Sequence, residues 1–394
     1  MTKLRLAIFI LSLVIVGTMG TLVYFYAKGY RFDLEKSKIT PSGLLVANSN
    51  PTGAQVIING ELKTATNSTI SLSPGTYDLV IKKEGFLTWE KRVTIEKEIV
   101  TQVDVDLFTS APSLSAITFS GVFKPTPNSD FTKIAYGVPA SKEPTISLSA
   151  NEKEGLWIIE ANNLPIGFSR EPRRITDGNL TEASWVWSPD SREILLTTKN
   201  GIFLLDTSTF TPQNQRVNVA SKIEDIQKSW AEKEQKQLFT KLSKLPDEVS
   251  EFFSKKATDI EFSPDENKIL YTAKESAKLP EGVIKPMPGS STQKQTREIK
   301  PGFRYVFDIK EDRNFEVAEK EVICHWFPTS RHIVIPQKDK IIISDYDGTN
   351  KKEVFSGSYI FPYAFPYSST TKLLILTNLG ASNAFGDLYS LNLR

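Results

Sequence analysis

The side chains that could do chemistry are few, and several of them lie close together in the sequence. His325 and His332 are the two histidines, and Cys324, the single cysteine, adjoins the first of them. Thiolate and imidazole groups are ligands for zinc, so this Cys-His-x6-His set is one possible metal site. Alternation along a strand would place Cys324 and His325 on opposite faces, however, and no further ligand is evident. We therefore expect ordinary strand residues here, and we predict no metal and no cofactor.

The acidic segment 345–350, Asp-Tyr-Asp-Gly-Thr-Asn, is a second candidate metal site. Its spacing resembles the start of a calcium loop, but such a loop needs a bidentate Glu at its twelfth position, where Ser356 stands here. The Asp-Gly pair explains the segment as a hairpin turn without an ion. We predict the turn.

Enzyme motifs are missing from the sequence. It contains no Gly-x-Ser-x-Gly nucleophile elbow and no Gly-x-x-x-x-Gly-Lys phosphate loop. Paired carboxylates for glycoside hydrolysis would meet only in space, so the sequence leaves that chemistry open. We predict no catalytic residue, and we keep as an alternative a carbohydrate-active enzyme that uses the funnel of a repeat domain.

Composition bounds the class of protein. The chain has 394 residues, of which 40% are hydrophobic, and its formal net charge is +2. Two or three domains with real cores are expected at this length. A nearly neutral chain with mixed charges gives no electrostatic reason to bind nucleic acid, so no nucleic-acid partner is predicted.

The N-terminal segment 6–26 is 21 residues long and carries no charge. About 20 apolar residues span the hydrocarbon core of a bilayer. Aromatic residues close the segment at 24–26, and Lys28 and Arg31 follow, as at a membrane interface. We predict a single-pass anchor with most of the chain extracytoplasmic. A cleaved signal peptide and a cytoplasmic orientation are the alternatives.

After a polar linker at 27–42, residues 43–109 alternate apolar and polar in short runs separated by turns. The Asn59-Gly60 pair is a strong hairpin signal. A small β-sandwich is expected. Four stretches in it resemble the PEGA domain: Ser49–Ala54, Val56–Gly60, Leu72–Tyr77 and Lys83–Phe86. The tetrapeptide that names the family reads Pro-Thr-Gly-Ala here, with Thr in place of Glu. The resemblance implies an extracytoplasmic, structural or binding role and supplies no active-site residue.

Residues 113–394 repeat one template: an apolar strand, a turn with Pro, and two further strands. The clearest copies begin at Trp187-Ser188-Pro189-Asp190 and Phe262-Ser263-Pro264-Asp265, and five copies of roughly 43 residues remain when two inserted segments are set aside. This pattern predicts a β-propeller of five blades, or six if an insert hides another. The region resembles TolB-like and Trp-Asp-repeat propellers, which host enzymes, binders and scaffolds alike. Residues 114–119 are expected to pair with the last blade and close the ring.

Two segments interrupt the repeats. Residues 215–257 show helical spacing, with a capping box at 221–224, and a helical hairpin that lies on the propeller is expected. A partner-docking surface is the sharper hypothesis. Its candidate residues are Ile226, Trp230, Leu238, Leu242, Phe252 and Phe253. Residues 277–301 are rich in Pro, Ser and Gly and predict a mobile loop.

Together these patterns indicate an all-β protein behind a transmembrane helix. We expect a non-enzymatic binding or scaffold protein of the cell envelope. Its predicted partners are the membrane, through the N-terminal helix, and a protein or a cell-wall glycan.

Overall fold

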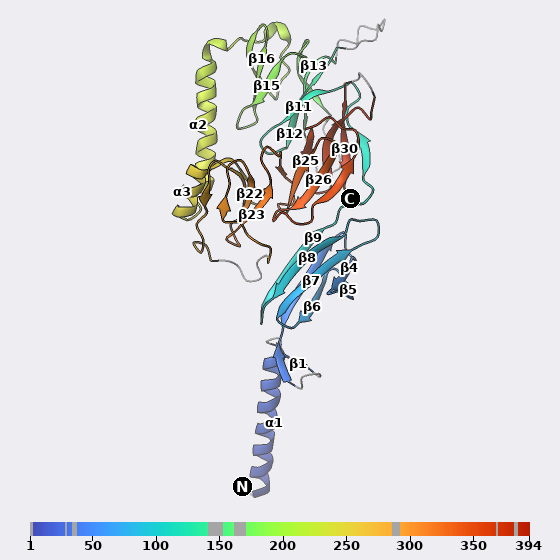
Figure 1. Ribbon diagram of the computed structural model, residues 1–394, viewed down its shortest axis with the longest axis vertical. Helices are drawn as coiled ribbons and strands as arrows, with labels where there is room; N and C mark the ends of the chain where they lie inside the picture. Colours follow the sequence, from blue (N-terminus) through green and yellow to red (C-terminus); the bar gives the residue numbers. More distant parts are fainter. Residues whose placement is uncertain are drawn as a thin grey trace. The chain divides into compact units, whose positions relative to one another are not determined.

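The structure is a computed structural model that describes residues 3–27, 30–33, 38–140, 153–160, 171–285, 292–367, 369–381 and 385–394. The chain divides into two compact units (Figure 1). The first comprises Met1–Phe108 together with Lys285–Lys294, and the second comprises Thr109–Ile284 and Gln295–Arg394. We describe each unit by itself.

The first unit begins with helix α1 (Lys3–Ala27). Its span Arg5–Tyr26 has a mean hydropathy of 2.5 and its side chains are exposed along its length. A helix that is apolar all round needs an apolar environment, such as a bilayer. The length and composition fit a single-pass anchor or a signal sequence. The predicted linker at 27–42 contains a hairpin of β1 (Tyr30–Asp33) and β2 (Lys38–Pro41).

A two-sheet sandwich follows. Its strands are β3 (Gly43–Asn50), β4 (Gln55–Ile58), β5 (Glu61–Ala65), β6 (Ser68–Leu72), β7 (Gly75–Lys82), β8 (Trp89–Ile95) and β9 (Val100–Asp106). They form one sheet in the order β6-β3-β9 and another in the order β5-β4-β7-β8. Alternate residues such as Leu45, Val56 and Ile81 are fully buried in a shared core. The Asn59-Gly60 turn has positive φ at both residues, as the sequence predicted for this hairpin.

The second unit contains five antiparallel sheets of three or four strands within the described residues. The first two sheets hold β11 (Phe123–Pro127), β12 (Lys133–Val138), β13 (Gly155–Glu160) and β14 (Arg173–Asp177), then β15 (Ser184–Trp187), β16 (Glu193–Thr198) and β17 (Gly201–Asp206). The next two hold β18 (Ala257–Phe262), β19 (Lys268–Ala273), β22 (Arg304–Asp308) and β23 (Arg313–Ala318), then β24 (His325–Trp326), β25 (His332–Pro336), β26 (Lys340–Asp345) and β27 (Lys352–Ser356). The last sheet holds β28 (Ala364–Pro366), β29 (Lys372–Thr377) and β30 (Asp387–Asn392) with β10 (Ser113–Ala116).

Strand β10 closes the last sheet from the start of the unit. Leu114 pairs with Leu391 and Ala116 with Tyr389 in an antiparallel register. The pairing predicted for residues 114–119 is therefore confirmed for Ser113–Ala116. It joins the two ends of the unit and covers an edge of β30 that would otherwise be open.

The turn after the first strand of a sheet has the same geometry in several copies. Ser188 Oγ accepts hydrogen bonds from the amides of Arg192 and Glu193, at 3.2 and 2.9 Å, and donates to Asp190 Oδ1 at 2.7 Å. Ser263 repeats the bond to the amide five residues on, at 2.9 Å. The repeated Ser-Pro-Asp is thus a self-contained turn that starts the second strand of the second and third sheets.

Apolar clusters join neighbouring sheets. One unites the first and second sheets, another the first and the last, and a third the third and fourth. The indole of Trp187 donates to the carbonyl of Thr126 at 2.9 Å, and that of Trp326 donates to the carbonyl of Glu261 at 3.1 Å. The successive meanders and these side-by-side contacts define a propeller-like unit.

A helical insertion separates the second and third sheets. It comprises two short 3-10 turns, Gln213–Gln215 and Ala220–Lys222, and helices α2 (Ile223–Leu242) and α3 (Asp247–Lys256). The helices confirm that a helical insertion interrupts the repeats. The predicted capping box is wrong, because the 3-10 turn moves the N-cap to Lys222, whose side chain makes no capping hydrogen bond.

Candidate functional site

The six candidate docking residues occupy different environments on α2 and α3. Ile226 and Leu238 are partly buried, whereas Trp230, Leu242, Phe252 and Phe253 are buried. Phe253 packs edge-on against Tyr271 with ring centroids 5.1 Å apart, and it lies 5.7 Å from Phe307. Buried residues cannot contact a partner in this conformation. Docking by the hairpin stays a prediction, and it must use the other face of the helices.

The apolar side of the hairpin covers the third sheet. Val249 and Phe253 of α3 have no exposed surface and share a core with Ile269 of β19 and Tyr305 of β22. Figure 1 shows α3 beside β22 and β23, with the longer α2 leading to it. The helices therefore complete the core of that sheet, as the structural interpretation of the sequence expected.

The middle of α2 is exposed on every side. No residue from 231 to 237 is buried or half-buried, although these residues make nearly two turns of helix. The sequence there, Ala-Glu-Lys-Glu-Gln-Lys-Gln, consists of strong helix formers, which compensates for few tertiary contacts. One such contact is the ion pair of Lys233 with Asp190 at 4.0 Å. Such a helix is stable only if its ends are held.

Both ends of α2 are held. Before its start, the amide of Val219 donates to the carbonyl of Ile202 in the second sheet at 2.7 Å. Near its end, Lys241 pairs with Glu266 at 3.0 Å and lies over the ring of Phe262 at 5.3 Å. The exposed middle therefore presents a fixed polar surface with Phe239, which is 67% exposed, two residues beyond it.

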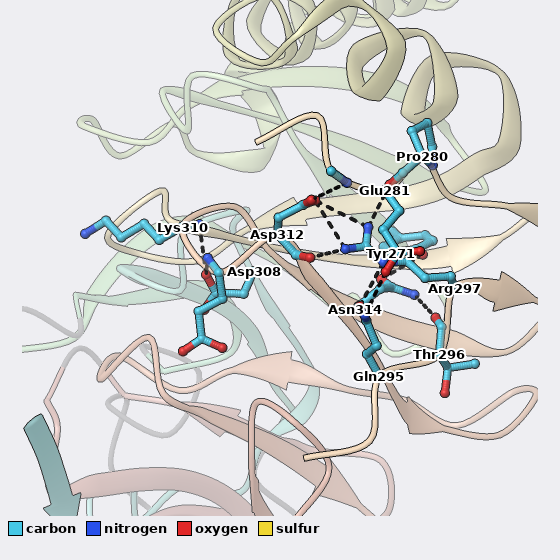
Figure 2. Close-up of polar contacts among 12 residues, drawn as sticks. Tyr271, Pro280, Glu281, Gln295, Thr296, Arg297, Asp308, Lys310, Asp312 and Asn314 are labelled. Atoms are coloured by element: carbon cyan, nitrogen blue, oxygen red, sulfur yellow. Dashed lines mark hydrogen bonds and ion pairs between the residues drawn. The ribbon is translucent and has the colours of Figure 1, made fainter. Parts of the chain in front are cut away.

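The segment 277–301 is tied to the third sheet by a buried polar network (Figure 2). The guanidinium of Arg297 forms an ion pair with Asp312 at 3.3 Å, and both side chains are almost fully buried. Arg297 also donates to the carbonyl of Pro280 at 2.7 Å. The second carboxylate oxygen of Asp312 accepts from the amide of Gly282 at 2.8 Å. One ion pair thus holds both described parts of the segment, 277–285 and 292–301, which we call its arms.

Asn314 extends this network across the sheet. Its amide donates to the carbonyl of Thr296 at 2.7 Å, and its oxygen accepts from the hydroxyl of Tyr271 at 3.0 Å. Beside it, β20 (Ala277–Lys278) pairs with β21 (Glu298–Ile299). The prediction of a mobile loop over 277–301 is therefore wrong for its two arms, and residues 286–291 lie outside the described residues.

Several charged and titratable groups of the third and fourth sheets influence one another. Arg304 of β22 lies 3.6 Å from Glu261 of β18. Burial raises the pKa of the Glu261 carboxyl, and Arg304 opposes that rise. His325 lies between the rings of Phe131 and Phe365, at centroid distances of 5.1 and 6.3 Å. Burial, with a smaller effect of Arg304, lowers the pKa of His325 to about 4.

The possible metal ligands point away from one another. Cys324 is fully buried in the core between the third and fourth sheets, whereas His325 contacts Phe131 and Phe365. His332 shares a hydrogen bond of 2.7 Å with Thr329. The opposite orientation predicted for Cys324 and His325 is confirmed. Among the residues that the structure describes, no group of three or more His, Cys, Asp or Glu could hold a metal.

The acidic segment 345–350 forms a turn. Asp345 accepts from the side-chain amide of Asn350 at 3.0 Å, and Asp347 accepts from the hydroxyl of Thr349 at 2.6 Å. Gly348 has a φ of 79° and donates its amide to the carbonyl of Asp345 at 3.0 Å. The turn predicted from the Asp-Gly pair is confirmed. Hydrogen-bond donors within the turn bind the carboxylates of Asp345 and Asp347.

The fold and sequence together place the sandwich of the first unit in a known class of small β domains. Residues 42–110 match the PEGA domain family, so this part of the chain is a PEGA domain. The match covers the whole sandwich from β3 to β9. The search of curated proteins found no match to the chain.

Solved structures similar to the chain include propeller proteins. A putative TolB from Agrobacterium tumefaciens is 12% identical, with 68% of this chain and 78% of that chain covered and a TM-score of 0.23. TolB from Acinetobacter baumannii is 12% identical, with 80% and 59% covered and a TM-score of 0.22. The Cps50 (Swd1) β-propeller domain of Myceliophteria thermophila is 10% identical, with 71% and 86% covered and a TM-score of 0.25. At these scores the strand pairing above, rather than the likeness, describes the fold.

Proposed function

We propose that the chain is a membrane-anchored, extracytoplasmic scaffold protein that presents a five-bladed β-propeller to a partner in the cell envelope. The apolar helix α1 supports the anchor, and the PEGA domain supports a structural or binding role. Five meander sheets and their closure by β10 support five blades. The second unit contributes the binding surface.

The exposed middle of α2 is the observation that carries the proposal. A helix held at both ends and uncovered between them offers a rigid surface, and rigid surfaces lose little entropy on binding. Residues 232–237 present both signs of charge, and Phe239 supplies an exposed aromatic anchor on the same side as Gln235 and Lys236. The partner of this surface is a protein with complementary charges and a pocket for the Phe239 ring.

The first test is topology. In intact cells or spheroplasts, protease should remove a tag fused at Arg394 without a breach of the membrane. Protection of the tag until the membrane is opened would place the second unit in the cytoplasm and overturn the envelope part of the proposal.

The second test is partner capture. A photo-crosslinking side chain at Gln235 should capture a protein partner, and Phe239→Ala should reduce that capture at least about tenfold, as for a binding hot spot. Val217→Ala is the matched control, since Val217 is also exposed but lies outside α2. Equal capture by the Phe239→Ala and Val217→Ala proteins would refute docking through α2.

One observation favours the enzyme alternative, a carbohydrate-active protein. Glu261 is a carboxyl group with a raised pKa on β18, the first strand of the third sheet, and general acids of glycosidases have raised pKa values. The ion pair with Arg304 gives the same group a structural role. Hydrolysis of a cell-wall polysaccharide by the wild type, with at least a hundredfold loss in Glu261→Gln and normal thermal unfolding, would establish the enzyme. No hydrolysis by either protein would dismiss it.

A further inference from the structure

Three segments meet at one end of the last sheet. The amide of Val122 donates to the carbonyl of Gly386 at 2.6 Å, and the hydroxyl of Thr118 donates to Asp387 at 2.8 Å. From the other side, the amide of Ile360 donates to the carbonyl of Leu376 at 2.8 Å. Residues 117–122, 357–363, 376–381 and 385–386 are therefore joined at this end, where β29 finishes and β30 begins.

Large apolar side chains stand in solvent on these segments. We call four of them the apolar rim: Phe119, Phe361, Leu379 and Phe385, which are 82%, 45%, 61% and 45% exposed. The ring of Phe385 lies 5.9 Å from that of Phe123, so the rim is continuous with the core beneath it. Single exposed apolar residues need no explanation, but a group of large ones on adjoining segments marks an interaction surface.

Leu379 occupies a backbone position that disfavours leucine. Leu379 and Gly380 have φ values of 50° and 83°, and the amide of Ala381 donates to the carbonyl of Asn378 at 3.0 Å. This is a tight turn with positive φ at both central residues, where Asn, Asp or Gly is preferred. A leucine there costs stability and gains no burial, so its exposed side chain calls for a role outside the fold.

The charge of the rim selects its ligand. Residues 117–122, 357–363, 378–381 and 385–386 contain no Asp, Glu, Lys or Arg, although such residues make up 24% of the whole chain. The adjoining Asp387 accepts from the hydroxyl of Thr118 at 2.8 Å and from the amide of Gly121 at 3.1 Å, so its carboxylate already serves the fold. A charged partner would lose hydration here and find no counter-charge. A bilayer with anionic lipids would normally meet Lys or Arg beside the apolar residues.

Three polar side chains on the segments of the rim are already used by the fold. The side-chain amide of Asn378 donates to the carbonyl of Ala381 at 2.7 Å, and the hydroxyl of Thr377 donates to that of Ser358 at 2.6 Å. The Tyr359 hydroxyl is bonded to the carbonyl of Gln337. A glycan needs several free directed donors and acceptors, whereas an apolar peptide segment does not.

We infer that the apolar rim binds an uncharged, apolar segment of a partner protein. This surface is distinct from the middle of α2 and lies on the last sheet, so the chain would hold a partner at two places. Phe119 and Leu379 are the anchors, since they are the most exposed members of the rim.

The test uses the full chain in nanodiscs with a fluorescent reporter. Ser120→Cys carries an environment-sensitive dye beside the rim, and the fully buried native Cys324 does not react in the folded protein. The probes are an end-capped peptide that alternates serine with leucine or phenylalanine, and a second peptide in which lysine and glutamate replace the apolar residues. A dye at Val217→Cys is the matched control away from the rim.

The rim dye should shift to the blue in a saturable way with the apolar peptide alone, and the control dye should not. Phe119→Ser with Leu379→Asn should weaken that binding at least about tenfold. Phe210→Ser, which changes another exposed phenylalanine, should leave it unchanged. Leu379→Asn should fold with an equal or higher thermal midpoint, because asparagine tolerates the positive φ.

Four results would overturn the inference. Equal binding of the charged peptide, or equal binding by the rim variant, would show that the surface is not selective. A blue shift that requires the bilayer and does not change when peptide is added would show that the rim binds lipid. A shift that grows with protein concentration, with dimers in sedimentation, would assign it to a second copy. Partner capture at Gln235 is measured separately, so failure at the rim leaves the role of α2 standing.

Discussion

Replacing His325 by phenylalanine should flatten the pH dependence of local stability around the fourth sheet. Burial lowers the pKa of this imidazole from its ordinary 6.5 to about 4. The folded state therefore binds fewer protons than the unfolded state between those values, and stability falls as pH drops from 6.5 to 4. Above pH 6.5 the imidazole is neutral in both the folded and the unfolded state, so His325 no longer makes the stability depend on pH.

The size of the effect follows from the shift. A difference of about 2.5 pKa units corresponds to roughly 3 kcal/mol at 1.36 kcal/mol per unit. His325 keeps part of its surface exposed, which reduces the figure toward about 2 kcal/mol. Phenylalanine preserves the ring contacts with Phe131 and Phe365 and cannot take up a proton. The wild type alone should lose this stability on acidification.

Cys324 supplies the assay, because it is fully buried next to His325 and reacts only after local opening. The reaction rate with a disulfide reagent that works in acid is measured for both proteins from pH 7 to pH 4. The ratio of the wild-type rate to the His325→Phe rate cancels the intrinsic reactivity of the thiol at each pH. That ratio should rise about thirtyfold or more between pH 7 and pH 4.

Glu261 titrates nearby, and its raised pKa acts with the opposite sign. Its folded state holds a proton longer, so its stability contribution falls as pH rises above 4.5. The ratio removes this contribution too, since both proteins contain Glu261. A ratio that stays constant within about twofold over the whole range would refute the buried, neutral state of His325.

Three further changes test the fold. Asp312→Ala should leave the buried Arg297 cation unpaired and lower the free energy of unfolding by about 3–5 kcal/mol. It should also expose the 277–301 arms to trypsin, which a cleavage time course on the wild type and the variant would show. Equal cleavage of the two proteins would contradict the network. Phe253→Ala should open a cavity between α3 and β19 and cost about 3–5 kcal/mol in urea unfolding, whereas truncation of the exposed Phe239 should cost less than about 1 kcal/mol. Trp187→Phe should lose the hydrogen bond to the Thr126 carbonyl and about 1 kcal/mol by thermal unfolding, and a loss above about 3 kcal/mol would show that packing dominates instead.

The sequence predicted the repeated elements because their signals are local. The Ser-Pro-Asp turn is made by residues five positions apart, so Ser188 and Ser263 can be recognised from the chain alone. The Asn59-Gly60 hairpin and the helical spacing of 223–253 are local in the same sense. Strand pairing of β10 with β30 is distant, and it was predictable because the last repeat lacked a strand.

The errors came from contacts that composition does not reveal. The arms of 277–301 look like a loop by their Pro, Ser and Gly content, yet Arg297 and Asp312, 15 residues apart, fix them. The candidate docking residues on α2 and α3 were chosen for their apolar character, and that character placed most of them in the core instead.

Apolar character thus has opposite meanings at the two places where this unit departs from its repeats. On α3 the apolar residues follow helical spacing, so they share one face and the third sheet covers it. On the rim they stand in turns, with no periodic face for a sheet to cover, and Leu379 even occupies a left-handed position. An apolar stripe on a helix is accounted for by its burial in the core, whereas an exposed leucine in a tight turn is not. For this reason the rim, and not the apolar face of the hairpin, is where exposed hydrophobic residues point to a partner.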